Sequence, residues 1–230
     1  TPAVPRYGSV SASGDLGPLS HIAAVLIGEG KVLDPGTGEP IATRDFLRRT
    51  SAFTPIELEW KEGLALNNGC QYSNAWGALA AAMMARLIEA AALSAALQVQ
   101  AMRGMGRPFR ADLHALRPHP GSKTIARWVF DLLAGYQFQD AGAGEPFDLL
   151  QDPYSLRCSA QVLGPCLDLV ERAEATMLIE ANSITDNPID LNGADASAYS
   201  LDNIVSGGHF HGMGLAVDAY GLIQAAAIMA

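Results

Sequence analysis

Three consecutive residues near the start of the sequence, Ala12-Ser13-Gly14, could build a reactive group out of the backbone itself. The amide nitrogen of Gly14 would attack the carbonyl carbon of Ala12, and Ser13 would lose its hydroxyl as water to leave an exocyclic alkene. Such a ring needs a small residue at the attacked carbonyl and a glycine as nucleophile, because a Cβ would obstruct the strained turn. Taken alone, however, the same residues are typical of a capped turn before a helix, because Ser, Gly and Asp favour such positions.

A second group of residues could hold a carboxylate. The segment QDPYSLR, residues 151–157, predicts a helix start with Asp152 as the N-cap and a proline in the first turn. Tyr154 and Arg157 would then share one helix face, with Gln151 just before the cap. A helix N-terminus favours an anion, and arginine can grip a carboxylate with two hydrogen bonds. The alternative is an exposed first turn with a surface arginine.

Two further motifs place polar side chains in loops. KEGLALNNGC, residues 61–70, puts Asn68 in front of a long helix, although alone it is an ordinary Asn-Gly turn. SGGHFHG, residues 206–212, places His209 and His211 on either side of Phe210. No acidic or thiol partner with suitable spacing stands nearby, so we expect no metal site and a structural or site-lining role for this motif.

The composition excludes several classes of function. The 230 residues carry a formal net charge of −9 and form no stripe of Lys and Arg, which argues against nucleic-acid binding. The three cysteines, Cys70, Cys158 and Cys166, cannot all pair and match no zinc spacing, so we expect free thiols in a reducing cytoplasm. The sequence starts at Thr1 without a basic and apolar leader, so we expect no signal peptide and a trimmed chain or a piece of a longer one.

Helix signals dominate the elements that must position these residues. Residues 75–103 are rich in alanine and carry Arg86 and Glu89 near their middle, which favours a central bundle helix over a membrane span. Few strand patterns occur, so the predicted class is all-α, a long-helix bundle. Further helices are expected over residues 19–27, 44–49, 55–61, 123–135, 152–180 and 203–230, with a short hairpin or loop over 31–43 and irregular stretches over 104–121 and 139–150.

Together, five motifs resemble those of the histidine and aromatic amino acid ammonia-lyases. The family patterns are GSxxASGDLxPLxH, KEGLALxNGT, QDxYSLRC, NSx(T/S)DNP and GGNFHG. The corresponding segments here are GSVSASGDLGPLSH at 8–21, KEGLALNNGC at 61–70, QDPYSLRC at 151–158, NSITDNP at 182–188 and GGHFHG at 207–212. They follow the family order and cover most of the chain. The resemblance implies a helical fold of the ammonia-lyase and fumarase type, with residues 1–230 as the central portion of one such domain.

The resemblance also implies a chemistry. Ala12-Ser13-Gly14 would cyclise autocatalytically into a methylidene-imidazolone group, an electrophile that needs no external cofactor. The reaction would remove ammonia from an L-aromatic amino acid or L-histidine and give an α,β-unsaturated acid. By the same resemblance, the catalytic residues beside the triplet would be Tyr154 and Asn68, and the substrate-binding residues would be Arg157, Gln151, Phe210 and His209.

Some features depart from the family pattern and leave alternatives open. His209 replaces the usual Asn beside Phe210, and Cys70 replaces the usual Thr. Family chains extend further on both sides, and the loop that carries their catalytic Tyr base precedes the triplet. An aromatic amino acid 2,3-aminomutase with the same group, and a non-catalytic or split-enzyme subunit that needs a partner chain, therefore remain alternatives. The expected partners are a small amino acid substrate and either three further copies, in a homotetramer, or chains that supply the missing regions, with no nucleic acid and no membrane.

Overall fold

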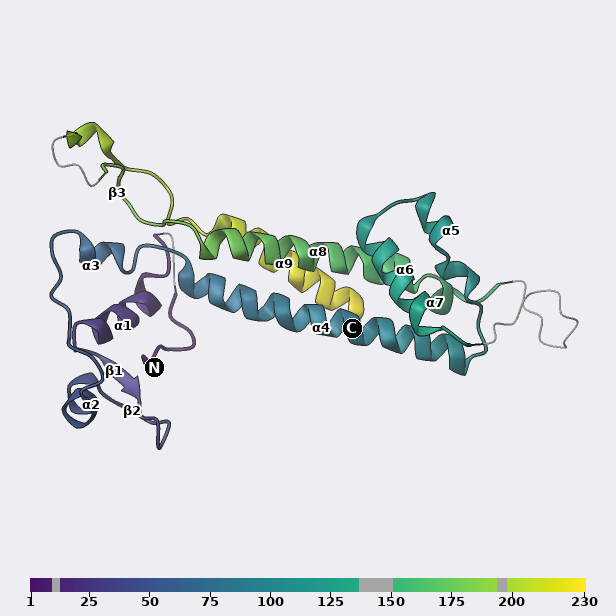
Figure 1. The fold of residues 1–230 in the computed structure, drawn as a ribbon, viewed down its shortest axis with the longest axis horizontal. Helices are drawn as coiled ribbons and strands as arrows, with labels where there is room; N and C mark the ends of the chain where they lie inside the picture. Colours follow the sequence, from purple (N-terminus) through teal and green to yellow (C-terminus); the bar gives the residue numbers. More distant parts are fainter. Residues whose placement is uncertain (10–12, 137–150, 194–197) are drawn as a thin grey trace, which may run out of the picture. The chain divides into compact units, whose positions relative to one another are not determined.

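The computed structural model describes residues 1–9, 13–136, 151–193 and 198–230 (Figure 1). These residues form two compact units. Unit 1 comprises Thr1–Trp76 with Leu178–Met213, and unit 2 comprises Gly77–Met177 with Gly214–Ala230. Helices dominate, and the described strands are short, so the predicted all-α class is confirmed.

Unit 2 is built around one hydrophobic core. Its main helices are α4 (Gln71–Ala101), α6 (Pro120–Leu132), α8 (Ser159–Ala181) and α9 (Met213–Met229), with the short elements η1 (Arg107–Phe109), α5 (Ala111–Ala115) and α7 (Tyr154–Arg157). In Figure 1, α4, α8 and α9 run alongside one another, and buried side chains from α4, α6, α8 and α9 form one cluster. Glycines let α6 and α8 approach closely, since a Cβ on Gly121 would overlap the carbonyl of Gly164.

The burial pattern of the long helix α4 accounts for its alanine-rich composition. Its buried residues Ala81, Ile88, Ala92 and Val99 recur at spacings of about one or two turns and face the unit 2 core. By length and composition, α4 is the one described helix that could cross a membrane, a test that the core helix of a soluble protein also passes. Its buried face supports the predicted bundle role.

Unit 1 combines short helices with two small hairpins. Its elements are α1 (Leu16–Leu26), β1 (Lys31–Leu33), β2 (Pro40–Ala42), α2 (Thr43–Thr50), α3 (Glu62–Ala65), β3 (Ile189–Asp190), η3 (Leu201–Asn203) and β4 (Ile204–Val205). Strands β1 and β2 pair antiparallel with Val32 opposite Ile41, which confirms the predicted hairpin. The Asp34 carboxylate accepts a hydrogen bond from the Gly36 amide at 2.8 Å and so closes the turn. Strands β3 and β4 form the second antiparallel pair.

Several predicted boundaries were wrong for identifiable reasons. The helix expected over 55–61 does not form, because the Ile56 amide bonds to the Leu26 carbonyl and Lys61 adopts a left-handed φ of +70°. The helix expected over 152–180 is divided at Cys158 into α7 and α8, and Asp152 does not cap it. The last helix begins only at Met213, and the stretch 104–121 contains η1 and α5. The irregular stretch expected over 139–150 lies outside the described residues.

Candidate functional site

The structure brings Ser13, Gly14 and Asn68 together in unit 1. The side-chain amide of Asn68, itself buried, donates a hydrogen bond to the Ser13 carbonyl at 2.6 Å. Gly14 has a φ of +91°, and a Cβ at this position would lie 2.6 Å from the carbonyl oxygen of Gly69. Only glycine fits such a turn. The neighbouring Ala12 lies outside the described residues.

Asp15, the residue that follows the triplet, is held by hydrogen bonds to the Asn68 loop and to the start of α4. Its amide donates to the Gly69 carbonyl at 2.7 Å, and its buried carboxylate accepts hydrogen bonds from Ser9 Oγ at 2.6 Å and from Ser73. Ser73 contributes both its amide, at 2.7 Å, and its hydroxyl, at 2.8 Å. Asp15 therefore satisfies a free amide in the first turn of α4 rather than capping α1 with its side chain. No local sequence pattern indicates this partner, because Ser73 lies 58 residues further along the chain.

The NSITDNP segment supports the Asn68 loop from the other side. Lys61 at the start of that loop forms a mostly buried ion pair with Asp186. Gln71 at the end of the loop donates a hydrogen bond to the Thr185 hydroxyl at 2.7 Å. Asn187 then accepts a hydrogen bond from the Gly207 amide at 2.8 Å, which links this segment to GGHFHG. Three motifs that are far apart in the sequence thus hold one another around Asn68.

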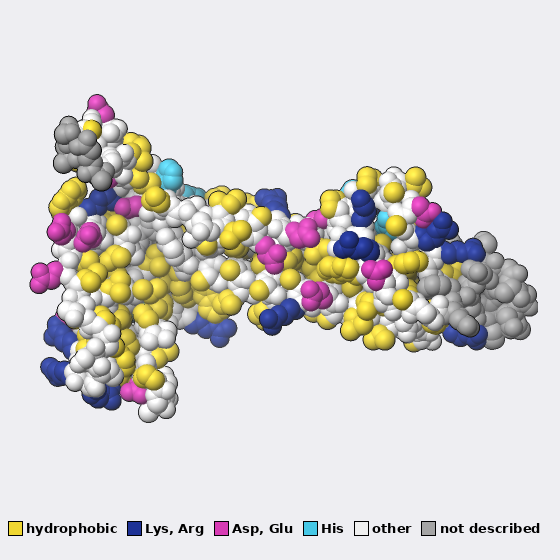
Figure 2. Space-filling view, viewed as in Figure 1, with side chains coloured by type: hydrophobic (Ala, Val, Ile, Leu, Met, Phe, Trp, Pro, Cys, Tyr) yellow, Lys and Arg dark blue, Asp and Glu magenta, His cyan; other side chains and the backbone are white. Residues whose placement is uncertain are grey.

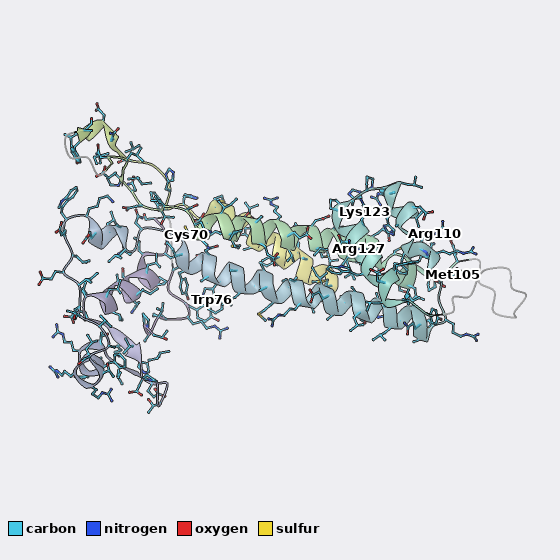
Figure 3. All side chains as sticks on the ribbon, viewed as in Figure 1. Cys70, Trp76, Met105, Arg110, Lys123 and Arg127 are labelled. Carbon is cyan, nitrogen blue, oxygen red and sulfur yellow. The ribbon has the colours of Figure 1, made fainter. Side chains whose placement is uncertain are left out.

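Cys70 lies directly before α4 (Figure 3) and holds the Phe210 segment there. Its thiol donates to the Phe210 carbonyl at 2.9 Å. Burial, and then the carboxylates of Asp15 and Glu180, raise the pKa of this thiol to about 11, so it stays protonated and can donate at neutral pH. His209 is exposed, and Phe210 is half-buried. In the described part of the chain, no group of three His, Cys, Asp or Glu side chains could hold a metal ion.

Gln151, Tyr154 and Arg157 belong to unit 2, whereas Ser13 and Asn68 belong to unit 1. The Arg157 guanidinium lies over the Tyr154 ring, 4.6 Å from its centre, which confirms that the two share a face. Arg157 Nε donates to the Asp152 carbonyl at 2.8 Å. The Asp152 carboxylate accepts from the Met105 amide at 2.7 Å, so it is engaged away from the helix it was predicted to cap. Tyr154 and Gln151 are exposed.

The described residues form long helices, a glycine turn that an asparagine holds by a hydrogen bond, and an arginine stacked on a tyrosine. These features define a helical protein with the loop motifs of amino acid lyases. The chain belongs to the aromatic amino acid lyase family, whose sequence profile matches residues 1–230.

Relatives and solved structures agree with this assignment. Histidine ammonia-lyases of Roseobacter denitrificans and Sorangium cellulosum are each 42% identical, over 95% and 94% of this chain and 41% of each relative. The crystal structure of tyrosine aminomutase from Streptomyces globisporus is 33% identical with a TM-score of 0.81, over 100% of this chain and 44% of that one. Phenylalanine ammonia-lyase from Rhodosporidium toruloides is 31% identical with a TM-score of 0.82, over 100% and 34%. The chain thus spans about two fifths of the length of these curated relatives.

Proposed function

We propose that this chain carries the electrophile-forming region of an ammonia-lyase that eliminates ammonia from L-histidine or an L-aromatic amino acid. The observation that carries the proposal is the hydrogen bond from Asn68 to the Ser13 carbonyl beside the left-handed Gly14. L-Histidine comes first among the substrates, because the two relatives at 42% identity are histidine ammonia-lyases.

The residues present fit a methylidene-imidazolone group formed from Ala12-Ser13-Gly14. Gly14 already has the positive φ and the crowded surroundings that exclude a side chain. The Asn68 amide is placed to stabilise negative charge on the Ser13 oxygen, which such a ring would retain as a carbonyl. Once formed, the group supplies an electrophile that makes the substrate's amine a better leaving group, with no external cofactor.

Arg157 is the residue that we assign to the substrate carboxylate. Its Nε is used by the Asp152 carbonyl, while its two terminal nitrogens make no hydrogen bond with any described residue. Those two nitrogens form the fork that binds a carboxylate with two parallel hydrogen bonds. The Tyr154 ring stacks against the Arg157 guanidinium and brings a phenol beside it. We propose that this chain acts within an assembled enzyme, either a homotetramer or an assembly with chains that supply the remaining family regions.

Changing Ser13 to Ala tests the proposal with two readouts. The unchanged protein is expected to have an intact mass lower by two water molecules than its sequence requires, and the Ser13→Ala chain cannot form the alkene. Deamination of L-histidine by the complete assembly is then expected to fall by roughly a thousandfold or more, because the electrophile is lost. Ser94→Ala, an exposed serine on α4, is the matched control and should leave both the mass deficit and the activity intact.

The same measurements separate the alternatives. The tyrosine aminomutase structure at 33% identity favours an aminomutase as the second candidate. A β-amino acid product in place of an unsaturated acid would establish that activity and exclude the lyase. A full, undiminished mass in the unchanged protein would exclude both and indicate a non-catalytic subunit.

A further inference from the structure

We propose that a cavity beside α6 in unit 2 binds a small planar aromatic monocarboxylate. The cavity has a volume of about 520 Å³, which lies in the range of small-molecule pockets. It is lined by side chains from η1, α5 and α6 and contains none of the residues predicted for the lyase site. The inference is therefore independent of the proposed function.

Two unpaired cations provide the charge for an anion. Lys123 and Arg127 are four residues apart on α6, and both line this cavity. Figure 3 labels both side chains. Neither side chain forms an ion pair or a hydrogen bond with any described residue. In contrast, Arg110 just before α5 is paired with Asp112. Figure 2 shows Lys and Arg side chains gathered over this part of unit 2, in a chain whose overall net charge is −9.

The balance of charge selects a monoanion. Asp131 is the acidic residue of the described lining, and it forms no ion pair with Arg127 one turn away. The fixed charges of Lys123, Arg127 and Asp131 therefore sum to +1. A single carboxylate compensates that charge, whereas a polyphosphate would bring further negative charge against Asp131.

The aromatic side chains that line the cavity favour a ligand with an aromatic ring. Phe109 is buried at one side of the cavity, and Phe130 is half-exposed at its lining. The buried His114 ring adds a further flat wall, held by its Nε2 at 3.0 Å from the Pro108 carbonyl. Aromatic rings pack favourably against one another in offset or edge-to-face contacts. A planar ring between these walls would direct its carboxylate to Lys123 and Arg127.

Titration calorimetry of the full chain with cinnamate tests this inference, and neutral cinnamamide is the matched probe. We expect cinnamate to bind at least about tenfold more tightly than the amide, and Arg127→Gln or Lys123→Gln each to weaken cinnamate about tenfold, the usual effect of one charged hydrogen bond. Arg117→Gln removes an exposed arginine outside the cavity and should change the dissociation constant less than about twofold. Circular dichroism should show unchanged helix content in all three variants.

Three outcomes would overturn the inference. The first is the absence of saturable cinnamate binding at millimolar concentration. The second is equal affinity for the acid and the amide. The third is binding that survives Arg127→Gln but is lost in Arg157→Gln, which would assign the carboxylate to the predicted lyase site and leave the proposed function untouched.

Discussion

At the scale of single residues, the ionisation of Cys70 makes the free energy of unfolding depend on pH. Its pKa is raised from 9.0 to about 11 by burial first, and then by Asp15 and Glu180. In the unfolded chain the thiol loses its proton near its ordinary pKa, whereas the folded chain retains it up to about 11. Between these values the folded state binds more protons, so the free energy of unfolding falls as the pH rises from about 9 to 11.

Urea unfolding at several pH values measures this effect. Burial also raises the pKa of the Cys166 thiol, so that residue contributes part of the decrease in the free energy of unfolding. The comparison with Cys70→Thr isolates Cys70, because threonine keeps a hydroxyl donor for the Phe210 carbonyl and does not titrate. We expect a shallower fall in this variant, and identical slopes in the two proteins would show that Cys70 ionises normally.

At the scale of elements, the Lys61–Asp186 pair joins two loops that meet around Asn68. Both side chains are mostly buried, so Asp186→Asn leaves the Lys61 ammonium without its counter-charge. We expect a loss of roughly 3 kcal/mol in the free energy of unfolding, measured with urea. Asp45→Asn breaks the exposed pair with Arg48 and should cost less than about 1 kcal/mol. Equal losses in the two variants would mean that the buried pair does not hold the loops.

The elements also show which parts of the fold and the candidate site could be predicted from the sequence alone. The hairpin over 31–43 was predictable because Pro and Gly fix its turn locally, and α4 was predictable because its alanines extend without a break. Gly14 and Asn68 were found through motifs, and the structure gives them a shared contact. The cap predicted for Asp152 was wrong, because its partner, the Met105 amide, lies 47 residues away. Such long-range pairs leave no local pattern, and the pairing of Asp186 with Lys61 was not predicted for the same reason.

At the scale of the whole molecule, α4 has a second apolar face that stays exposed among the described residues. Leu79, Met83 and Leu87 recur every four residues and stay exposed, with Met83 at 72%, while other residues of α4 fill the core. Exposed apolar faces of this kind mark association surfaces, which is what the proposed tetramer requires.

Sedimentation velocity at micromolar concentration tests whether this face joins chains. We expect a species larger than the monomer, and Met83→Lys should shift it toward smaller species, because a lysine at an apolar interface loses contacts and carries a charge out of water. Leu116→Lys introduces the same charge at a more exposed leucine, 84% accessible, in the connection between α5 and α6, and should leave the distribution unchanged. If the unchanged chain sediments as a monomer, the exposed face of α4 must be covered by another part of the complete enzyme and not by a second copy of these residues.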